Sequence, residues 1–199
     1  TPSAFTFVTA LDADLKKGLD GHSPDARTAQ LLKATLAKYK VSSVDSLPIN
    51  FDAISMQQAE EDGNKVFDRH YGALYDTYRK QNTVHQLGAV IAPLMAVRSL
   101  SMGLAGTDVE HHQAFANAAE RYRRRLVKTM NESMAANSRS GDFSYKADPS
   151  LWREVPPFEY EAPPIAQAMA MQAPSLWLLG GWLLVALVSV ARTRSLRLD

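Results

Sequence analysis

An uncharged apolar run near the C-terminus limits what this chain can fold into. Residues 173–191 read APSLWLLGGWLLVALVSVA and contain no charged side chain. About 20 apolar residues cross the hydrocarbon core of a bilayer as an α-helix. Trp177 stands at the entry of the run, as interfacial aromatic residues do, whereas Trp182 lies deeper than such a position. The run predicts one transmembrane helix, and the alternative is a buried core helix of a soluble protein.

The charges on the two sides of this run differ. Three glutamates precede it and three arginines follow it, namely Glu154, Glu159, Glu161 and then Arg192, Arg194, Arg197. Basic residues gather on the cytoplasmic side of a transmembrane helix. We therefore expect residues 192–199 to form a cytoplasmic tail and residues 1–172 to lie outside the cytoplasm. The chain begins at Thr1 without an initiator methionine, so we expect a processed product or a fragment of something longer.

Residues before the run carry the sequence pattern of helices. Ser23, Pro24 and Asp25 combine a cap, a first-turn proline and an acidic first turn, which predicts a helix through about Lys38. Further helices are predicted over residues 4–20, 55–81, 107–136 and 149–153, the third from a Ser55–Gln58 capping box. Residues 40–54 are predicted to be a loop with short strands. The fold class is mainly α, a helical bundle over residues 1–154 followed by one transmembrane helix.

Two segments interrupt this pattern. Residues 87–97 (LGAVIAPLMAV) are apolar but too short to span a bilayer, and they fit either a buried core helix or an interfacial segment, kinked at Pro93. Residues 155–164 (VPPFEYEAPP) are too rich in proline for a helix. We interpret residues 155–172 as a semi-rigid strap between the bundle and the membrane.

A cluster of acidic and imidazole side chains opens the helix predicted from residue 107. Asp108, His111 and His112 are the candidate metal ligands. Asp108 and His112 share a helix face, so that His70 or His85 would have to complete a site. The alternative is that acidic residues simply favour a helix N-terminus. We expect alanine at either adjacent histidine to leave folding intact, and we predict no metal and no cofactor.

Other charged residues give no catalytic pattern. Residues 120–125 (ERYRRR) would contact anionic lipid headgroups or form a solvated helix face, with Glu120 paired to Arg124. Glu60 and Glu61 belong to an acidic cluster that nothing in the sequence places in a cleft. The formal net charge of +1 gives no field that would recruit nucleic acid, and the absence of cysteine excludes disulfides. No phosphate-binding loop of the G-x-x-x-x-G-K-[ST] type occurs.

Three ordered blocks carry a family resemblance. They are LPINFDAISMQQAEE at residues 47–61, SMGLAGTDVEHHQAFANAAERYR at residues 101–123 and LWREVPPFEYEAPP at residues 151–164. Followed by a last apolar run, they resemble the C-terminal part of a bacterial family of ABC-2 type transporter permeases. The resemblance covers nearly the whole chain. It implies a helical domain inserted between transmembrane helices of the inner membrane, with the last helix returning to the cytoplasm.

The resemblance also implies partners. These are a separate ABC ATPase subunit, a homodimer or heterodimer of permeases, the lipid bilayer, and a periplasmic protein that docks on the outer domain. The family assigns no catalytic or substrate residues. We therefore expect a transporter subunit rather than an enzyme. Two alternatives stay open: a single-pass anchored binding or adaptor protein, and an anchored metal-dependent hydrolase that uses the Asp108/His112 region.

Overall fold

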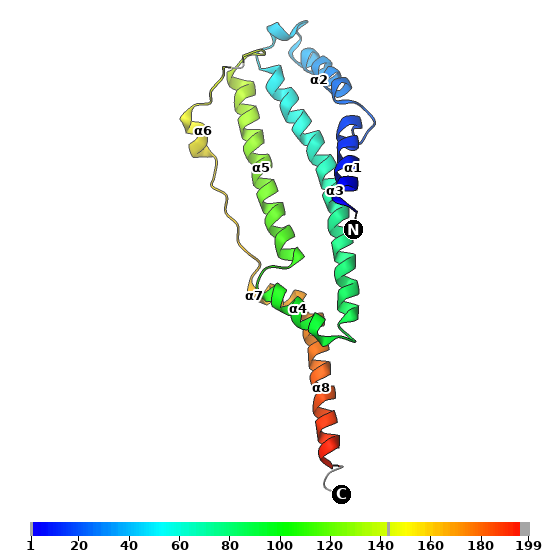
Figure 1. Cartoon of the computed structure of the whole chain (residues 1–199). Helices are drawn as coiled ribbons and strands as arrows, with labels where there is room; N and C mark the ends of the chain where they lie inside the picture. The colour runs from blue at the N-terminus through cyan, green and yellow to red at the C-terminus, as the bar shows by residue number, and fades with distance from the viewer. Residues whose placement is uncertain (1, 143, 196–199) are drawn as a thin grey trace. The chain divides into compact units, whose positions relative to one another are not determined.

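The fold is mainly α, as the sequence predicts (Figure 1). The computed structural model describes residues 2–142 and 144–195, which form eight α-helices and one 3₁₀-helix and contain no strand. The strands predicted over residues 40–54 are therefore wrong. The 3₁₀-helix η1 (Val44–Ser46) lies there instead, closed by a bond from Leu47 N to Val44 O of 3.0 Å.

The first two helices follow their capping signals. Ser3 caps α1 (Ala4–Lys17), and Ser23 caps α2 (Pro24–Tyr39), where its Oγ accepts from Ala26 N at 3.3 Å. Helix α1 ends at Gly18, whose φ of 75° takes the chain out of the helix, so it is shorter than predicted. The predicted start of α2 is confirmed.

Helix α3 (Phe51–Gly88) starts earlier and ends later than predicted. Its cap is Asn50, whose Oδ1 accepts from Asp52 N at 2.9 Å and from Ala53 N at 3.3 Å. Asn50 is fully buried, and its Nδ2 donates to Ser138 Oγ at 2.8 Å. These tertiary bonds make Asn50 the cap, so the predicted start at Ser55 is wrong. No proline stops the helix before Pro93.

Pro93 starts a helix rather than kinking one. It is the first residue of α4 (Pro93–Leu104), a position where its missing N–H costs nothing. Helix α5 (Val109–Asn137) and the single turn α6 (Pro149–Glu154) lie where the sequence predicts them. Residues 155–164 contain no helix, and α7 (Ile165–Met171) and α8 (Ala173–Ser195) complete the chain. Helix α7 was not predicted.

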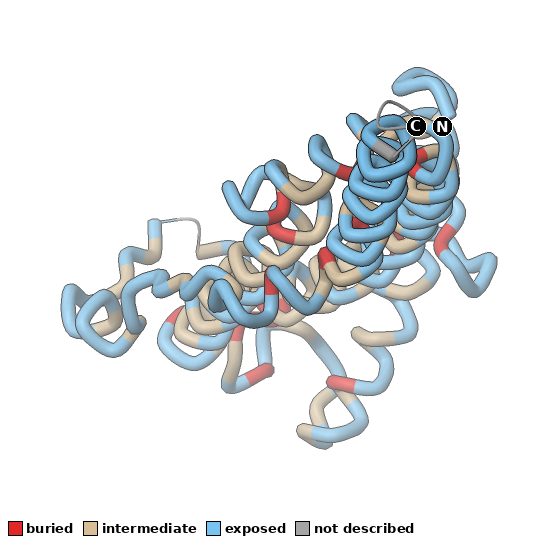
Figure 2. The backbone as a smooth tube through the Cα atoms, turned by 90° about the horizontal axis from the view of Figure 1, so that it is seen from below, coloured by how far each residue is buried: buried red, intermediate tan, exposed pale blue. Residues whose placement is uncertain are grey.

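The chain divides into two compact units. The first comprises Thr1–Leu74 and Ala119–Glu159, and the second comprises Tyr75–Ala118 and Tyr160–Asp199. Helices α3 and α5 contribute residues to both units. Fully buried side chains are few, and Figure 2 shows them scattered among exposed and intermediate positions.

Within the first unit, α3 is the central helix. Helices α1 and α2 follow one side of it and α5 the other (Figure 1), with the Asp14–His70 and Arg27–Asp62 pairs joining α1 and α2 to α3. Leu47, Phe51 and Val66 are buried in this unit. Within the second unit, α4 packs against α7 and α8. Ala96 and Gly103 are buried there, because small residues let the helices approach closely.

Candidate functional site

The second unit holds the candidate residues of the sequence. Asp108 caps α5, because its Oδ1 accepts a hydrogen bond from His111 N at 2.9 Å. The same oxygen accepts from His111 Nδ1 at 2.6 Å, and the His111 ring is 8% exposed. His112 is exposed. The histidine side chain that contacts Asp108 is therefore that of His111, whereas the candidate metal site in the sequence combined Asp108 with His112.

His70 and His85, the other two candidate histidines, do not complete a metal site with Asp108. His70 belongs to the first unit, where its Nε2 bonds to Asp14 Oδ2 at 2.8 Å. His85 is exposed in the last turn of α3. Across residues 2–142 and 144–195, no group of three or more His, Cys, Asp or Glu side chains is placed to hold a metal ion.

Gln172 links Asp108 to the start of α8. Its Nε2 donates to Asp108 Oδ2 at 3.3 Å, and its Oε1 accepts from Ser175 Oγ at 3.5 Å. Gln172 is 7% exposed and Ser175 is 1% exposed. We call Asp108, His111, Gln172 and Ser175 the α5–α8 node. It joins the cap of α5, the residue between α7 and α8, and the first turn of α8.

A glycine in α4 makes room for this node. A Cβ on Gly103 would lie 2.6 Å from the Cγ and Nε2 atoms of Gln172. Any larger residue there would displace the amide from Asp108. Neither Gln172 nor Ser175 is among the candidate residues that the sequence pattern indicates. The only available signal was their position, because they are polar side chains three residues apart at the start of the apolar run.

A cavity of about 310 Å³ adjoins the node in the second unit. Its walls carry a cation and two carboxylates, with Arg79 donating to Gln113 Oε1 at 3.1 Å nearby. This cavity offers both donors and acceptors to a small polar molecule. The lining residues are Tyr78, Arg79, Asn82, Gln86, Ser99, Met102, Asp108, Val109, Glu110, Met171 and Gln172.

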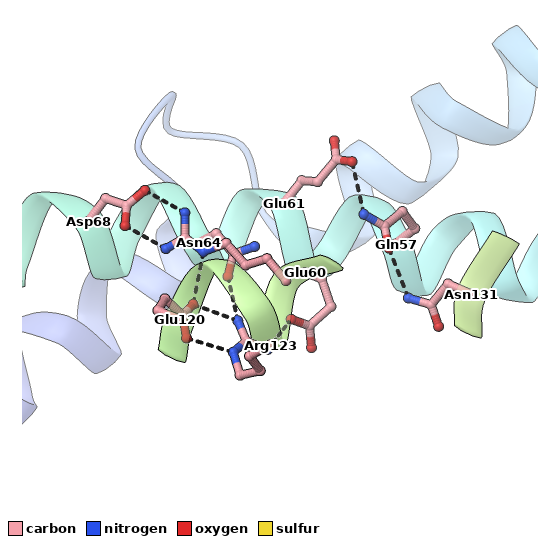
Figure 3. Close-up of polar contacts among 9 residues, drawn as sticks. Gln57, Glu60, Glu61, Asn64, Asp68, Glu120, Arg123 and Asn131 are labelled. Carbon is pink, nitrogen blue, oxygen red and sulfur yellow. Dashed lines mark hydrogen bonds and ion pairs between the residues drawn. The ribbon is translucent and has the colours of Figure 1, made fainter. Parts of the chain in front are cut away.

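The first unit contains a different polar cluster, between α3 and α5 (Figure 3). Arg123 donates to Glu120 Oε2 at 2.8 Å, to Glu60 Oε2 at 3.0 Å and to Asn64 Oδ1 at 2.7 Å. Arg124 donates to Glu120 Oε1 and to Asp68 Oδ2, each at 2.9 Å. These residues form the α3–α5 ion-pair cluster. It joins two helices that are distant in sequence.

The cluster fixes the charges of its members. The hydrogen bonds from Arg123 and Arg124 lower the pKa of Glu120 to about 2, against the opposing effect of burial. The bonds to Glu120, Glu60 and Asp68 raise the pKa of the two guanidinium groups. The predicted Glu120–Arg124 pair is confirmed. The prediction of a purely solvated helix face is wrong for Arg123 and Arg124, because both bond to side chains of α3. Arg121 and Arg125 are exposed.

The acidic residues of α3 also line a cleft. A groove of about 460 Å³ follows the cluster, and Glu60 and Glu61 form part of its wall together with Lys65, Arg124 and Lys128. No pattern in the sequence places Glu60 and Glu61 in a cleft. Charges of both signs alternate in this groove, which leaves no strongly electropositive surface for a lipid headgroup at that place.

The strap packs on α5 through its aromatic residues. In the first unit, the Phe158 ring lies 5.4 Å from that of Tyr122, centroid to centroid. In the second unit, Tyr160 meets Phe115 edge to face at 5.2 Å. The extended course of residues 155–164 is therefore held by side-chain contacts as well as by its prolines.

Helix α8 is the one helix, in the part of the chain that the structure describes, that is long and apolar enough to cross a membrane. Most of its apolar side chains are exposed, including Trp177, Leu184 and Leu187. Arg192 and Arg194 lie in its last turn, and Arg197 lies outside the described residues. These features define a helical protein with one candidate membrane span.

A match to a known family covers most of the chain before α8. Residues 6–161 match the family model described as a domain of unknown function, DUF3526. The match covers most of the chain, and the chain belongs to this family. No curated protein and no solved structure matches it significantly.

Proposed function

We propose that this chain is part of the permease subunit of an ABC-2 type transporter, and that α8 is one of its transmembrane helices. The observation that carries the proposal is the apolar surface of α8. Trp177, Leu184 and Leu187 are 81%, 64% and 57% exposed, along a helix of 23 residues. Exposed apolar surface costs about 25 cal/mol per Å² in water, and lipid or neighbouring spans remove that cost.

The charges at the end of α8 support an orientation. Arg192 and Arg194 close the helix, and acidic side chains such as Glu159 and Glu161 precede it. This asymmetry favours a cytoplasmic C-terminus in the inner membrane, with residues 1–172 outside. An ABC-2 permease whose last span returns to the cytoplasm has the same orientation.

The three blocks that resemble such permeases coincide with the polar contacts of the fold. The block at residues 47–61 contains the buried cap Asn50, and the block at residues 101–123 contains Asp108 and Arg123. The third block supplies Phe158 to the aromatic contact with Tyr122. The blocks that carry the resemblance therefore contain residues that determine how the helices join.

The proposed mechanism is indirect. ATP-driven closure of a partner ATPase moves the transmembrane helices, α8 among them, and the α5–α8 node transmits that movement to α5 through the Gln172–Asp108 bond. The helical domain then acts as a gate, a surface that guides substrate, or a docking site for a periplasmic protein. ATP hydrolysis takes place in the partner, because no phosphate-binding loop occurs in this sequence.

The experiment is affinity purification of the tagged protein from its own membranes under mild detergent. We expect a nucleotide-binding subunit to copurify, and ATP turnover to appear when the complex is reconstituted in lipid. A control purification after salt washing at high ionic strength distinguishes a bound subunit from peripheral contamination. Recovery of the protein with no ATPase would contradict the permease and favour the single-pass adaptor.

A further inference from the structure

Trp182 forms a hydrogen bond that shows how far along α8 the backbone of Val90 lies. Its indole Nε1 donates to the backbone carbonyl of Val90 at 3.2 Å. Trp182 is nine residues beyond Ala173, which starts α8, and is therefore about 14 Å along the helix axis. Helical side chains lean toward the N-terminus of their helix, so the Val90 carbonyl lies somewhat nearer the start of α8 than the backbone of Trp182 does. If α8 spans a membrane, Val90 lies beside the first half of the span.

The surface around Val90 has the chemistry of a lipid-facing segment. We call residues 87–94, where α3 turns into α4, the α3–α4 tip. Its outward side chains are apolar, with Leu87 67%, Ile91 83% and Leu94 76% exposed. Residues 86–97 contain no charged side chain. Apolar side chains this exposed, next to one another, mark a contact with another apolar phase.

Backbone polar groups of the tip are largely bonded within the protein. The N–H groups of residues 89–92 each donate to a carbonyl of residues 85–88, at N···O distances of 3.0 to 3.1 Å. Residue 93 is proline and has no N–H to satisfy. The Val90 carbonyl accepts the Trp182 indole N–H. Irregular backbone is tolerated at membrane depth only when its polar groups are bonded within the protein.

Packing turns the apolar side chains of the tip outward. Ala89 and Ala96 are 2% and 1% exposed, and α4 packs against α8 within the second unit. The small residues therefore lie inside, while Ile91 and Leu94 face away. The exposed side chains of α8 are apolar as well, among them Leu183, which is 61% exposed.

We propose that the α3–α4 tip is a second membrane-inserted element, which enters the acyl-chain region of the leaflet that contains the first half of α8. The occupant of its surface is lipid. The surface lies beside α8, as the bond from Trp182 to Val90 shows, it carries no charge for a polar partner, and the N–H groups of residues 89–92 are bonded within the protein. The proposal rests on α8 being a membrane span, as in the proposed function. It explains why Trp182 lies too deep for an interfacial belt, since its partner is a backbone carbonyl rather than the headgroup region.

The absence of cysteine from this sequence makes a labelling test direct. Ile91→Cys is labelled with the environment-sensitive fluorophore NBD, and the protein is reconstituted in phosphatidylcholine vesicles. Quenching is then measured with doxyl-labelled phosphatidylcholine and with aqueous iodide. Two matched variants are labelled in the same way. Leu187→Cys reports on α8 itself, and Val8→Cys reports on an exposed apolar position of α1.

We expect the label at Ile91 to lose fluorescence to doxyl lipid as the label at Leu187 does, and to resist iodide. The label at Val8 should show the reverse. Iodide quenching at Ile91, with lipid quenching at Leu187, would overturn the insertion of the tip while leaving α8 as a span. Protection of Ile91 from both quenchers would also overturn it, in favour of a protein partner. Iodide quenching at Leu187 would contradict the proposed function itself.

Discussion

Asp108 accepts a hydrogen bond from Gln172 across 64 residues of sequence, at 3.3 Å between Oδ2 and Nε2. Asp108 caps α5 through His111 N, and Gln172 is the residue directly before α8. The bond therefore joins the start of α5 to the start of α8, the candidate membrane span. Both side chains are largely buried, so water competes little for the bond.

Replacing Gln172 by alanine should destabilise the second unit. The substitution removes the donor to Asp108 and the acceptor of Ser175, and buried groups left without a partner cost about 1–3 kcal/mol. Thermal unfolding in detergent, followed by circular dichroism, measures the effect. Gln167→Ala in α7 is the matched control, because Gln167 is exposed. Equal midpoints for the two variants would contradict a structural role for the Gln172 bond.

The adjacent histidines should respond differently to alanine. His111 is buried and bonded to Asp108, so His111→Ala leaves a cavity and removes a charge-assisted bond. We expect a loss of about 1–3 kcal/mol. His112 is exposed, and His112→Ala should change stability by no more than about 0.5 kcal/mol. Urea unfolding of both variants checks the difference. A larger loss of stability for His112→Ala than for His111→Ala would contradict His111 as the partner of Asp108.

Acid should weaken the α3–α5 ion-pair cluster in a defined range. The hydrogen bond from Arg123 lowers the pKa of Glu120 from its ordinary value of 4.5 to about 2. A carboxyl whose pKa is lower in the folded state stabilises the fold above its unfolded pKa. This contribution is therefore complete above pH 4.5 and is lost as the pH falls from 4.5 toward 2.

Glu120→Gln isolates that contribution. Its side chain is 37% exposed, so solvent screening limits the effect to about 1 kcal/mol or less. Unfolding midpoints are measured for both proteins between pH 7 and pH 2. The difference between them should be constant at neutral pH and should shrink below pH 4.5. A difference that grows on acidification would mean that the pKa of Glu120 is raised rather than lowered.

Local signals in the sequence were sufficient for the helix starts that depend on local capping. Ser23, Asp108 and Pro149 stand at the starts of α2, α5 and α6, because each start is set by one side chain or one ring within the same turn. The start of α3 was missed. Asn50 becomes a cap through bonds to Ser138 and Arg139, which lie 88 and 89 residues away, and no local pattern contains them.

The site was predicted only in part for the same reason. The acidic first turn singled out Asp108, but helical spacing suggested His112 as its partner, whereas the cap geometry turns Asp108 toward His111. Gln172 belongs to the segment that the sequence predicts to be a strap, and only the fold places its side chain beside Asp108. Likewise, Arg123 resembled a solvated residue, because its partners Glu60 and Asn64 belong to another helix.

Two glycines in α8 offer a test of contacts between spans. A Cβ on Gly180 or Gly181 would meet no atom within 4 Å, so this side of α8 is open to a neighbour. Small residues allow transmembrane helices to pack closely. Replacing both glycines with leucine should therefore impair assembly with other spans or ATP turnover in lipid. Insertion and the fold of the helical domain should be unchanged, since leucine is at least as lipophilic as glycine.

Copurification of the ATPase with the wild type and with the double variant measures this effect. Gly63→Ala in α3 is a suitable control, because its Cβ also meets no atom within 4 Å but lies in the first unit. Unchanged assembly and turnover in the double variant would contradict packing through this pair of glycines.

The central claim is that α8 crosses the membrane with the helical domain outside the cytoplasm. Reporter fusion after Asp199 tests it most directly, with green fluorescent protein and alkaline phosphatase fused in parallel at the same residue. The arginines that follow the apolar run predict a fluorescent fusion and an inactive phosphatase. An active phosphatase with no fluorescence would place the C-terminus outside and contradict the orientation, and with it the account of residues 1–172 as an extracytoplasmic domain.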